Sequence, residues 1–160
     1  MKLLTQKQAR ELDILSLESS KIKGAQLMEA AGKIIADFLM DCIQNIDKES
    51  IGIVCGKGNN GGDGFASATF LHSKKYRIQI FCICSLDDLS NDSQYFANQC
   101  LEMGISIQFS CINLIDELKN DFIIDGLLGT GVKGPVREEI MPIINTINSS
   151  KGKVISIDIP

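Results

Sequence analysis

The residues best suited to chemistry in this 160-residue chain form a glycine-rich stretch, GKGNNGGDG, at positions 56–64. The stretch lies between an apolar run at residues 51–55 and a segment of helical character at residues 65–71. A loop between a strand and a helix points free backbone N–H groups toward an anion, and glycines let a ligand approach the bare backbone. We therefore expect a phosphate- or hydroxyl-binding loop. The alternative is a tight turn without a ligand, which would need only one or two glycines.

The first part of the stretch also fits the GxGxxG fingerprint of dinucleotide-binding loops, a weak pattern when it stands alone. Two features disfavour an ordinary nicotinamide site. Asp63 places a carboxylate where a pyrophosphate needs donors, although it could instead bind a hydroxyl or cap the helix. Asn59 and Asn60 add amide oxygens that suit a cation or an N–H group.

A second glycine-rich loop, GTGVKG at residues 129–134, follows an apolar run at residues 122–128. Asp125 lies inside that run, and Asp158 lies near the end of the last apolar run. A carboxylate in such surroundings must be paired, protonated or bound to a cation, which makes both aspartates candidate functional groups. The alternatives are a structural bond to loop amides for Asp125 and a turn cap for Asp158. Lys133 could contact a ligand phosphate or simply be solvated.

Apolar runs alternate with helical patterns along the chain. The spacing predicts strands at residues 51–55, 76–84, 105–109, 122–128 and 154–159. It predicts helices at residues 5–20, 25–45, 65–75, 94–103 and 114–118, and a last helix that begins near Pro135 and ends near Asn148. Apolar strands between helices indicate an α/β fold, with a mainly parallel sheet covered on both faces.

In a doubly wound sheet of order 3-2-1-4-5, the first and fourth strands are neighbours, and the chain leaves them in opposite directions. This arrangement opens a crevice at their carboxyl ends. Because the two glycine loops follow these two strands, both should face one binding crevice. Gly32, in the middle of the second predicted helix, should mark close packing against another backbone such as the sheet.

The composition limits the class of protein. A length of 160 residues with 44% hydrophobic residues predicts one domain with a substantial core. The net charge of −4 disfavours a broad nucleic-acid surface, and no apolar run reaches membrane-spanning length. The first residues lack the apolar region of a secretory signal, so we expect a cytoplasmic protein.

The remaining residues of reactive type give weaker signals. The six cysteines contain no C-x-x-C pair, and Cys55, Cys82 and Cys84 lie in apolar runs, which predicts buried thiols and neither a metal site nor disulfides. His72, the single histidine, should face solvent or lie at a helix end, which gives little support to a histidine triad. Asp87 and Asp88 follow the second predicted strand, the position of the ribose-binding acid in an NAD enzyme. The simpler interpretation is a polar loop.

Together these motifs resemble the YjeF N-terminal domain family, the NAD(P)H-hydrate epimerases, across essentially the whole chain. The most specific match is GNNGGDG at residues 58–64. LMEAAG at residues 27–32, DGLLGTG at residues 125–131 and IDIP at residues 157–160 match further family motifs in the expected order.

The resemblance implies a Rossmann-like fold with two N-terminal helices. It also implies an enzyme that interconverts the R and S epimers of hydrated NADH or NADPH (NAD(P)HX), so that an S-specific dehydratase can restore the coenzyme. Relatives form homodimers. The residues it implies for substrate binding are Asn59, Asn60, Gly61, Gly62, Asp63, Gly129, Thr130, Gly131, Val132, Lys133, Gly134, Pro135 and Asp158. Asn60 and Asp125 would bind a potassium ion (K+).

The chemistry fits two catalytic aspartates. The hydroxyl sits on C6 of the reduced nicotinamide ring, beside the ring nitrogen. Loss of hydroxide, assisted by the nitrogen lone pair, gives a planar iminium ion, and water can return to either face. Asp125 or Asp158 would then carry the proton as general acid and base.

One departure from the family concerns the end of the sequence. The chain stops at Pro160, where the family continues with a Ser-Gly turn, further strands and a helix, so we expect a single domain over residues 1–160 that is truncated after Pro160. The last strand would be an exposed edge, and a serine ligand of the potassium ion would be missing.

Two other functions stay open at this point. The first is a non-catalytic module that binds a nucleotide or a protein. The second is an NAD(P)-dependent oxidoreductase, which would change the nicotinamide absorbance, although no Tyr–Lys catalytic pair is evident in the sequence.

Overall fold

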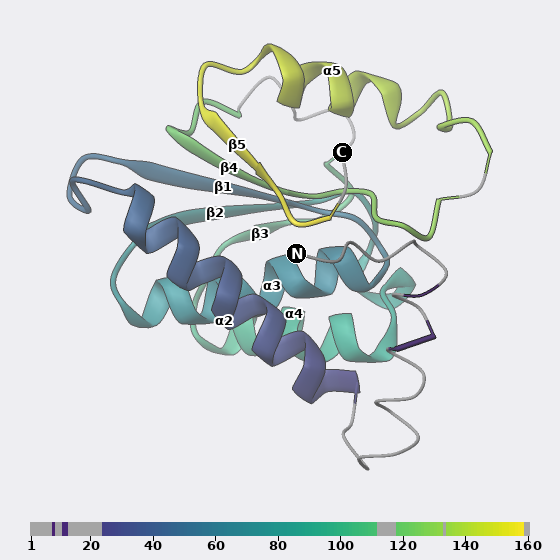
Figure 1. Ribbon diagram of the computed structural model, residues 1–160, viewed down its shortest axis with the longest axis horizontal. Coiled ribbons are helices and arrows are strands. Elements are labelled where there is room, and N and C mark those ends of the chain that lie inside the picture. The colour runs from purple at the N-terminus through teal and green to yellow at the C-terminus, as the bar shows by residue number, and fades with distance from the viewer. Residues whose placement is uncertain (1–7, 9–10, 13–23, 112–117, 133, 159–160) are drawn as a thin grey trace.

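The computed structural model describes residues 8, 11–12, 24–111, 118–132 and 134–158 (Figure 1). Most of the predicted first helix at residues 5–20, and most of the predicted short helix at residues 114–118, lie outside these residues. Among the helices of the described residues, none is both long and apolar enough to span a lipid bilayer.

The centre of the molecule is a five-stranded parallel sheet with the strand order β3-β2-β1-β4-β5, as predicted. Its strands are β1 (Ser50–Cys55), β2 (Arg77–Cys82), β3 (Ile107–Gln108), β4 (Phe122–Gly126) and β5 (Lys153–Ser156). Strand β3 is shorter than predicted, because only its residues 107 and 108 are in register with β2. Strand β1 lies in the middle and is almost completely buried, as its continuous apolar sequence requires.

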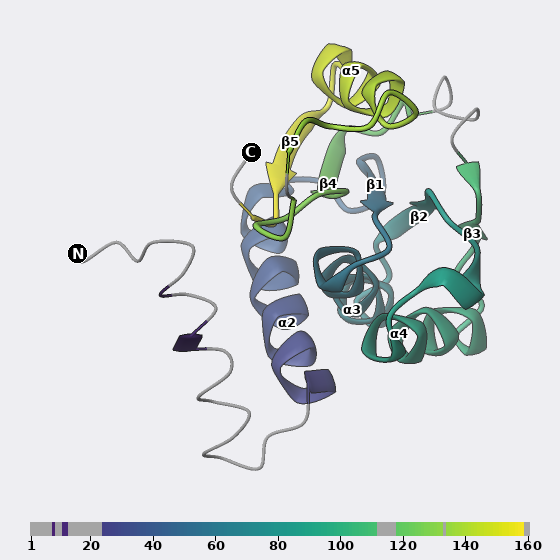
Figure 2. The ribbon, with the colours of Figure 1, turned by 90° about the vertical axis from the view of Figure 1, so that its right-hand side faces the viewer.

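Helices cover both faces of the sheet. They are α2 (Gly24–Cys42), α3 (Asn59–Ser73), α4 (Asn91–Glu102) and α5 (Met141–Ser149), with a short 3-10 turn, η1 (Leu86–Asp88), before α4. Figures 1 and 2 show α2, α3 and α4 on one face and α5 on the other. The doubly wound architecture expected from the alternation of strands and helices is therefore confirmed.

The predicted starts of α3 and α5 are wrong by about six residues, and α4 begins at Asn91, three residues before its predicted start. Helix α3 begins at Asn59, six residues before the predicted start, so most of the first glycine stretch is helical. None of its glycines has a positive φ; among the described glycines only Gly104 and Gly134 do. Helix α5 begins at Met141 and not near Pro135, and the proline in its first turn is Pro142.

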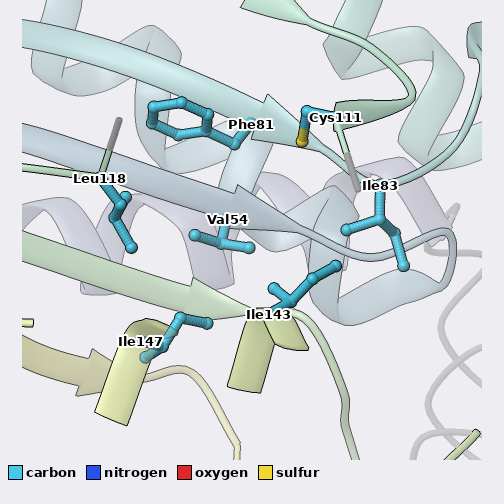
Figure 3. A pocket seen from close by; sticks show the side chains of 7 residues that line it. All are labelled: Val54, Phe81, Ile83, Cys111, Leu118, Ile143 and Ile147. Carbon is cyan, nitrogen blue, oxygen red and sulfur yellow. The ribbon is translucent and has the colours of Figure 1, made fainter. Parts of the chain in front are cut away.

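The sheet divides the core into two apolar layers. Ile53 and Ile124 face α2, α3 and α4, whereas Val54 and Ile123 face α5. Between the sheet and α5 the layer encloses a small apolar pocket, lined by Val54, Phe81, Ile83, Cys111, Leu118, Ile143 and Ile147 (Figure 3). Because the described residues of its lining offer only apolar side chains, this pocket is a gap in core packing, and those residues have nothing to orient a polar ligand.

Gly32 permits the close contact between α2 and α3. A Cβ atom at this position would lie 2.5 Å from the Cβ of Ala66 and 2.7 Å from the backbone nitrogen of Ser67. The predicted close approach to another backbone is confirmed, but the partner is a helix and not the sheet.

We expect Gly32→Ala to destabilise the protein. In an exposed helix this change would stabilise by about 1 kcal/mol, but here the new methyl group must displace the backbone of α3, so we expect a loss of about 1–3 kcal/mol. Urea unfolding measures the change. Ala30→Gly, at an exposed position of the same helix, should cost only about 1 kcal/mol; a stabilising Gly32→Ala would contradict the packing argument.

The amino ends of β1 and β4 are fastened by Asp121. Its Oδ2 accepts hydrogen bonds from the backbone N–H and the hydroxyl of Ser50, at 2.8 and 2.9 Å. These bonds hold the pKa of the Asp121 carboxyl below its ordinary value of 3.8. A lowered pKa in the folded state means that the charged carboxylate contributes stability above the unfolded pKa, and that this contribution is lost as the pH falls through the folded pKa.

Asp121→Asn should therefore lower the free energy of unfolding at neutral pH, by less than about 1 kcal/mol because the carboxylate is exposed to solvent. Urea unfolding of both proteins at neutral pH and below pH 3.8 checks this. The difference between the two proteins should shrink toward zero in acid. A difference that is constant across this range would show that the charge of Asp121 is not involved.

Candidate functional site

The carboxyl ends of β1 and β4 meet backbone to backbone. The N–H of Gly56, directly after β1, donates to the carbonyl oxygen of Gly126 at 3.0 Å. A side chain at Gly56 would overlap the carbonyl oxygen of Leu127, and one at Gly61 would overlap the carbonyl oxygen of Gly56. Gly56 and Gly61 are required because other backbone segments lie too close for a side chain. The contact of Gly56 with Gly126 and Leu127 brings the two glycine-rich loops together.

Asn60 links the two loops directly. It lies in the first turn of α3, and its side-chain Nδ2 donates to the carbonyl oxygen of Leu128 at 2.6 Å. The bond joins residues 68 positions apart. Because the amide nitrogen is used in this way, the amide oxygen of Asn60 is oriented as an acceptor or cation ligand.

The start of α3 supplies backbone donors. Its N-cap is Gly58, which has no side chain to accept from the first turn. The first amides of a helix lack acceptors within the helix and carry the positive end of its dipole. Asn59 is exposed and Asp63 is half-buried, whereas Gly61 and Gly62 are buried against the chain itself.

Asp125 occupies the α5 side of β4. It is in register with Val54 of β1 and Ser156 of β5. The carboxylate is half-buried, and its Oδ1 accepts from the N–H of Leu127 at 3.0 Å. Burial raises the pKa of the Asp125 carboxyl above its ordinary value, and the bond from Leu127 acts in the opposite direction. The structural bond to a loop amide that the sequence left open is thus present, and it uses only one carboxylate oxygen.

Asp158 lies two residues beyond β5 and holds the second glycine loop. Its Oδ2 accepts from the N–H of Thr130 at 2.6 Å. A Cβ atom on Gly129 would lie 3.0 Å from the same oxygen and 3.3 Å from the Cβ of Asn60. Asp158, Gly129 and Asn60 therefore converge, although they come from three separate parts of the sequence.

The two carboxylates line one open cleft along β5 and α5. Its lining residues are Asp125, Leu127, Leu128, Ile144, Asn148, Val154, Ser156 and Asp158. The cleft combines two acidic groups with apolar walls, a setting in which charge interactions are stronger than in water. It can hold a cation or stabilise a positively charged intermediate.

The rest of the second loop lies further out. Gly131, Val132, Gly134 and Pro135 are exposed, and Lys133 lies outside the described residues. Thr130 is half-buried, and its N–H donates to Asp158.

Several cleft residues were missed by the sequence analysis. Ser156 lies two positions before Asp158, which is the strand period, so alternation could have indicated it. Ile144 and Asn148 are four positions apart on α5, but the wrong start of that helix hid their shared face. The carbonyl of Leu128 gives no sequence signal, because every residue carries one.

The predicted burial of the cysteines is confirmed in part. Cys55 and Cys82 are buried free thiols, whereas Cys84 is free but only half-buried. Burial raises the pKa of the Cys82 thiol to about 12. His72 lies in the last turn of α3. Among the described residues, no group of three or more His, Cys, Asp or Glu side chains is placed to hold a metal ion.

The chain is thus an α/β protein with a doubly wound parallel sheet and two glycine-rich loops at the switch point, the place where ligands bind in open α/β sheets. The family described as "YjeF-related protein N-terminus" matches residues 24–160, and the chain belongs to this family.

Four known proteins illustrate the similarity, three by sequence and one by structure. The chain is 33% identical to an NAD(P)H-hydrate epimerase of Rhodopirellula baltica, over 98% of its own length and 64% of the relative. It is 35% identical to an NAD(P)H-hydrate epimerase of Aedes aegypti, over 100% of its length and 70% of the relative. It is 31% identical to the bifunctional NAD(P)H-hydrate repair enzyme Nnr of Dictyoglomus turgidum, of which it spans 31%. The crystal structure of the yeast protein ynu0 shares the fold, with a TM-score of 0.85 at 24% identity, over 100% of this chain and 71% of that chain.

Asn60→Asp should destabilise the protein more than Asn59→Asp. Both changes add a carboxylate to the first turn of α3, which the helix dipole favours equally. Only Asn60→Asp removes the donor to Leu128 and sets a carboxylate against its carbonyl oxygen, so we expect a loss of about 1–3 kcal/mol. Urea unfolding compares the two variants. Equal free energies of unfolding would mean that the Asn60–Leu128 bond does not contribute to stability.

Proposed function

We propose that the protein interconverts the R and S epimers of hydrated NADH and NADPH at C6 of the reduced nicotinamide ring, a coenzyme repair reaction. The observation that carries this proposal is the placement of Asp125 and Asp158 in one cleft, at the point where the two glycine loops meet. Membership of a family with relatives named NAD(P)H-hydrate epimerase supports it.

The reaction needs a proton carrier and a place for positive charge. One aspartate protonates the C6 hydroxyl as the C–O bond breaks, and water leaves. The electron pair of the ring nitrogen forms the C=N bond of a planar iminium ion, whose positive charge the second carboxylate stabilises. Water then adds to the opposite face, and its proton returns to the carboxylate. No electron is transferred, so the coenzyme keeps its redox state.

The two loops bind the rest of the substrate in this proposal. The amides at the start of α3, from Asn59 onward, suit a phosphate or hydroxyl. Residues 129–135 of the second loop and Asp158 would contact the substrate on the other side.

Asn60 and Asp125 would hold a potassium ion in the same proposal. Both offer oxygen atoms, the ligands that hard cations prefer. The Nδ2 of Asn60 is engaged by Leu128, which leaves the amide oxygen for a cation, and a half-buried carboxylate such as Asp125 is stabilised by a neighbouring positive charge. When bound, the ion would supply that charge.

The biological setting completes the proposal. The S epimer would pass to an S-specific dehydratase, and the bifunctional relative is named a repair enzyme. A homodimer and a cytoplasmic location belong to the same proposal.

Epimerisation is tested with pure R epimer of hydrated NADH, in potassium buffer, by chromatography of the R-to-S ratio against the spontaneous rate. The chain should accelerate the exchange without change in the nicotinamide absorbance. Asp125→Asn and Asp158→Asn should each lower kcat/KM by at least about 100-fold, the usual contribution of a general acid or base. Asp121→Asn, at the opposite end of β4, should retain full activity.

Other outcomes favour the other functions. Full activity in both cleft variants would overturn the assignment of the carboxylates. Nucleotide binding without turnover, also in a chain extended beyond Pro160, would indicate a binding module. A change in nicotinamide absorbance would indicate an oxidoreductase.

A further inference from the structure

Two polar side chains among the described residues are completely buried, those of Ser67 and Ser93. Ser67 donates to the carbonyl oxygen of Gly64, one turn back in its own helix, at 2.8 Å. Ser93, in the first turn of α4, instead donates across 35 positions of the sequence to the carbonyl oxygen of Gly58, at 3.2 Å. A buried hydroxyl needs a hydrogen-bond partner, because burying it without one is costly. The partner of Ser93 lies outside its own helix, in the glycine loop, which suggests a specific role for this bond.

The remaining contacts of Ser93 converge on the same loop. The hydroxyls of Ser90 and Ser93 lie 2.8 Å apart, and Ser90 Oγ also accepts from the N–H of Ser93 as the N-cap of α4. Because Ser93 donates to Gly58, Ser90 must be the donor between the two hydroxyls. The N–H of Ser90 in turn donates to the carbonyl oxygen of Lys57 at 3.4 Å. The start of α4 is thus bonded to two successive carbonyl groups of the glycine loop.

Packing holds the loop from the other side. A Cβ atom on Gly62 would lie 2.5 Å from Ser93 Oγ and 2.5 Å from the Sδ of Met28 in α2. Gly62 is therefore enclosed between α4 and α2, and the first turn of α3 cannot move toward either helix without displacing a neighbour.

The bond from Ser93 and the packing around Gly62 fix the start of α3 at Gly58. As the N-cap of α3 it is exposed and has no side chain to fix the helix start. Its carbonyl oxygen accepts from the N–H of Gly62 at 3.1 Å, the first bond of the helix, and from Ser93. The Ser93 hydroxyl therefore holds the N-cap carbonyl group from another helix, and this bond fixes the direction in which the first turn begins.

We propose that Ser93 is a positioning residue for substrate binding: its hydroxyl sets the orientation of the first amides of α3 and of the Asn60 side chain. The effect on substrate rests on the proposed function, and the effect on the loop does not. Because the loop binds substrate in the ground state and the transition state alike, loss of this hydroxyl raises KM and leaves kcat nearly unchanged.

Ser93→Ala is tested against Ser67→Ala as the matched control. Both changes remove one completely buried hydroxyl, but only Ser93→Ala removes a bond to Gly58 at the start of α3. Amide hydrogen exchange should become faster at residues 58–62 in Ser93→Ala and stay unchanged there in Ser67→Ala. In the epimerase assay, Ser93→Ala should raise KM about tenfold, the effect of one lost hydrogen bond, while Ser67→Ala keeps the KM of the starting protein.

Ser93→Cys gives a further check, because a thiol of similar shape is a weaker donor; its KM should lie between those of the starting protein and Ser93→Ala. Equal exchange at residues 58–62 in the two alanine variants would overturn the inference, as would a fall in kcat at constant KM. If the starting protein shows no epimerisation, the proposed function fails, while hydrogen exchange still decides whether Ser93 holds the loop.

Discussion

The site depends on one close contact, between the backbones that leave β1 and β4. Gly56 donates to Gly126 and has no room for a side chain against Leu127. This contact is possible because parallel neighbours end at the same edge of the sheet, and it places the two loops side by side. The link from Asn60 to Leu128 and the bond from Asp158 to Thr130 lie at the same edge of the sheet. A cavity between sheet and helix, such as the apolar pocket near α5, has no comparable set of polar groups.

The architecture was predictable because its signals are repeated along the chain. Five apolar runs separated by helical patterns indicated a doubly wound sheet, and the order 3-2-1-4-5 of such a sheet then predicted that the two loops meet. The predicted starts of α3 and α5 were wrong because glycine and proline each occur in more than one structural setting. Glycine at residues 61–64 suggested a loop, but these glycines serve close packing inside a helix. Pro135 and Pro142 are both compatible with a helix start, and local sequence does not show which of them tertiary packing selects.

The site was predictable only where its side chains are unusual in their setting. Asp125 and Asp158 were chosen as candidates because carboxylates are rare in apolar runs, and the structure places both in one cleft. Ser93 was missed because serine is common near helix starts, and only its burial and its bond to Gly58 distinguish it. The Leu128 carbonyl could not be predicted at all. Every residue has a main-chain carbonyl group, so residue type does not show which of them orients a site.

The long span of the Asn60–Leu128 bond has a consequence for synthesis on the ribosome. Contacts within a helix form early. Pairing of distant strands comes later, because closing the long loop between them costs conformational entropy. A nascent chain that has exposed β1 and α3 holds only half of the site, and the other half arrives 68 positions later. Since Asp158 follows still later, no translation intermediate shorter than this can bring both carboxylates together. The cleft that holds both carboxylates would then assemble late in synthesis, after Asp158 has been added to the chain.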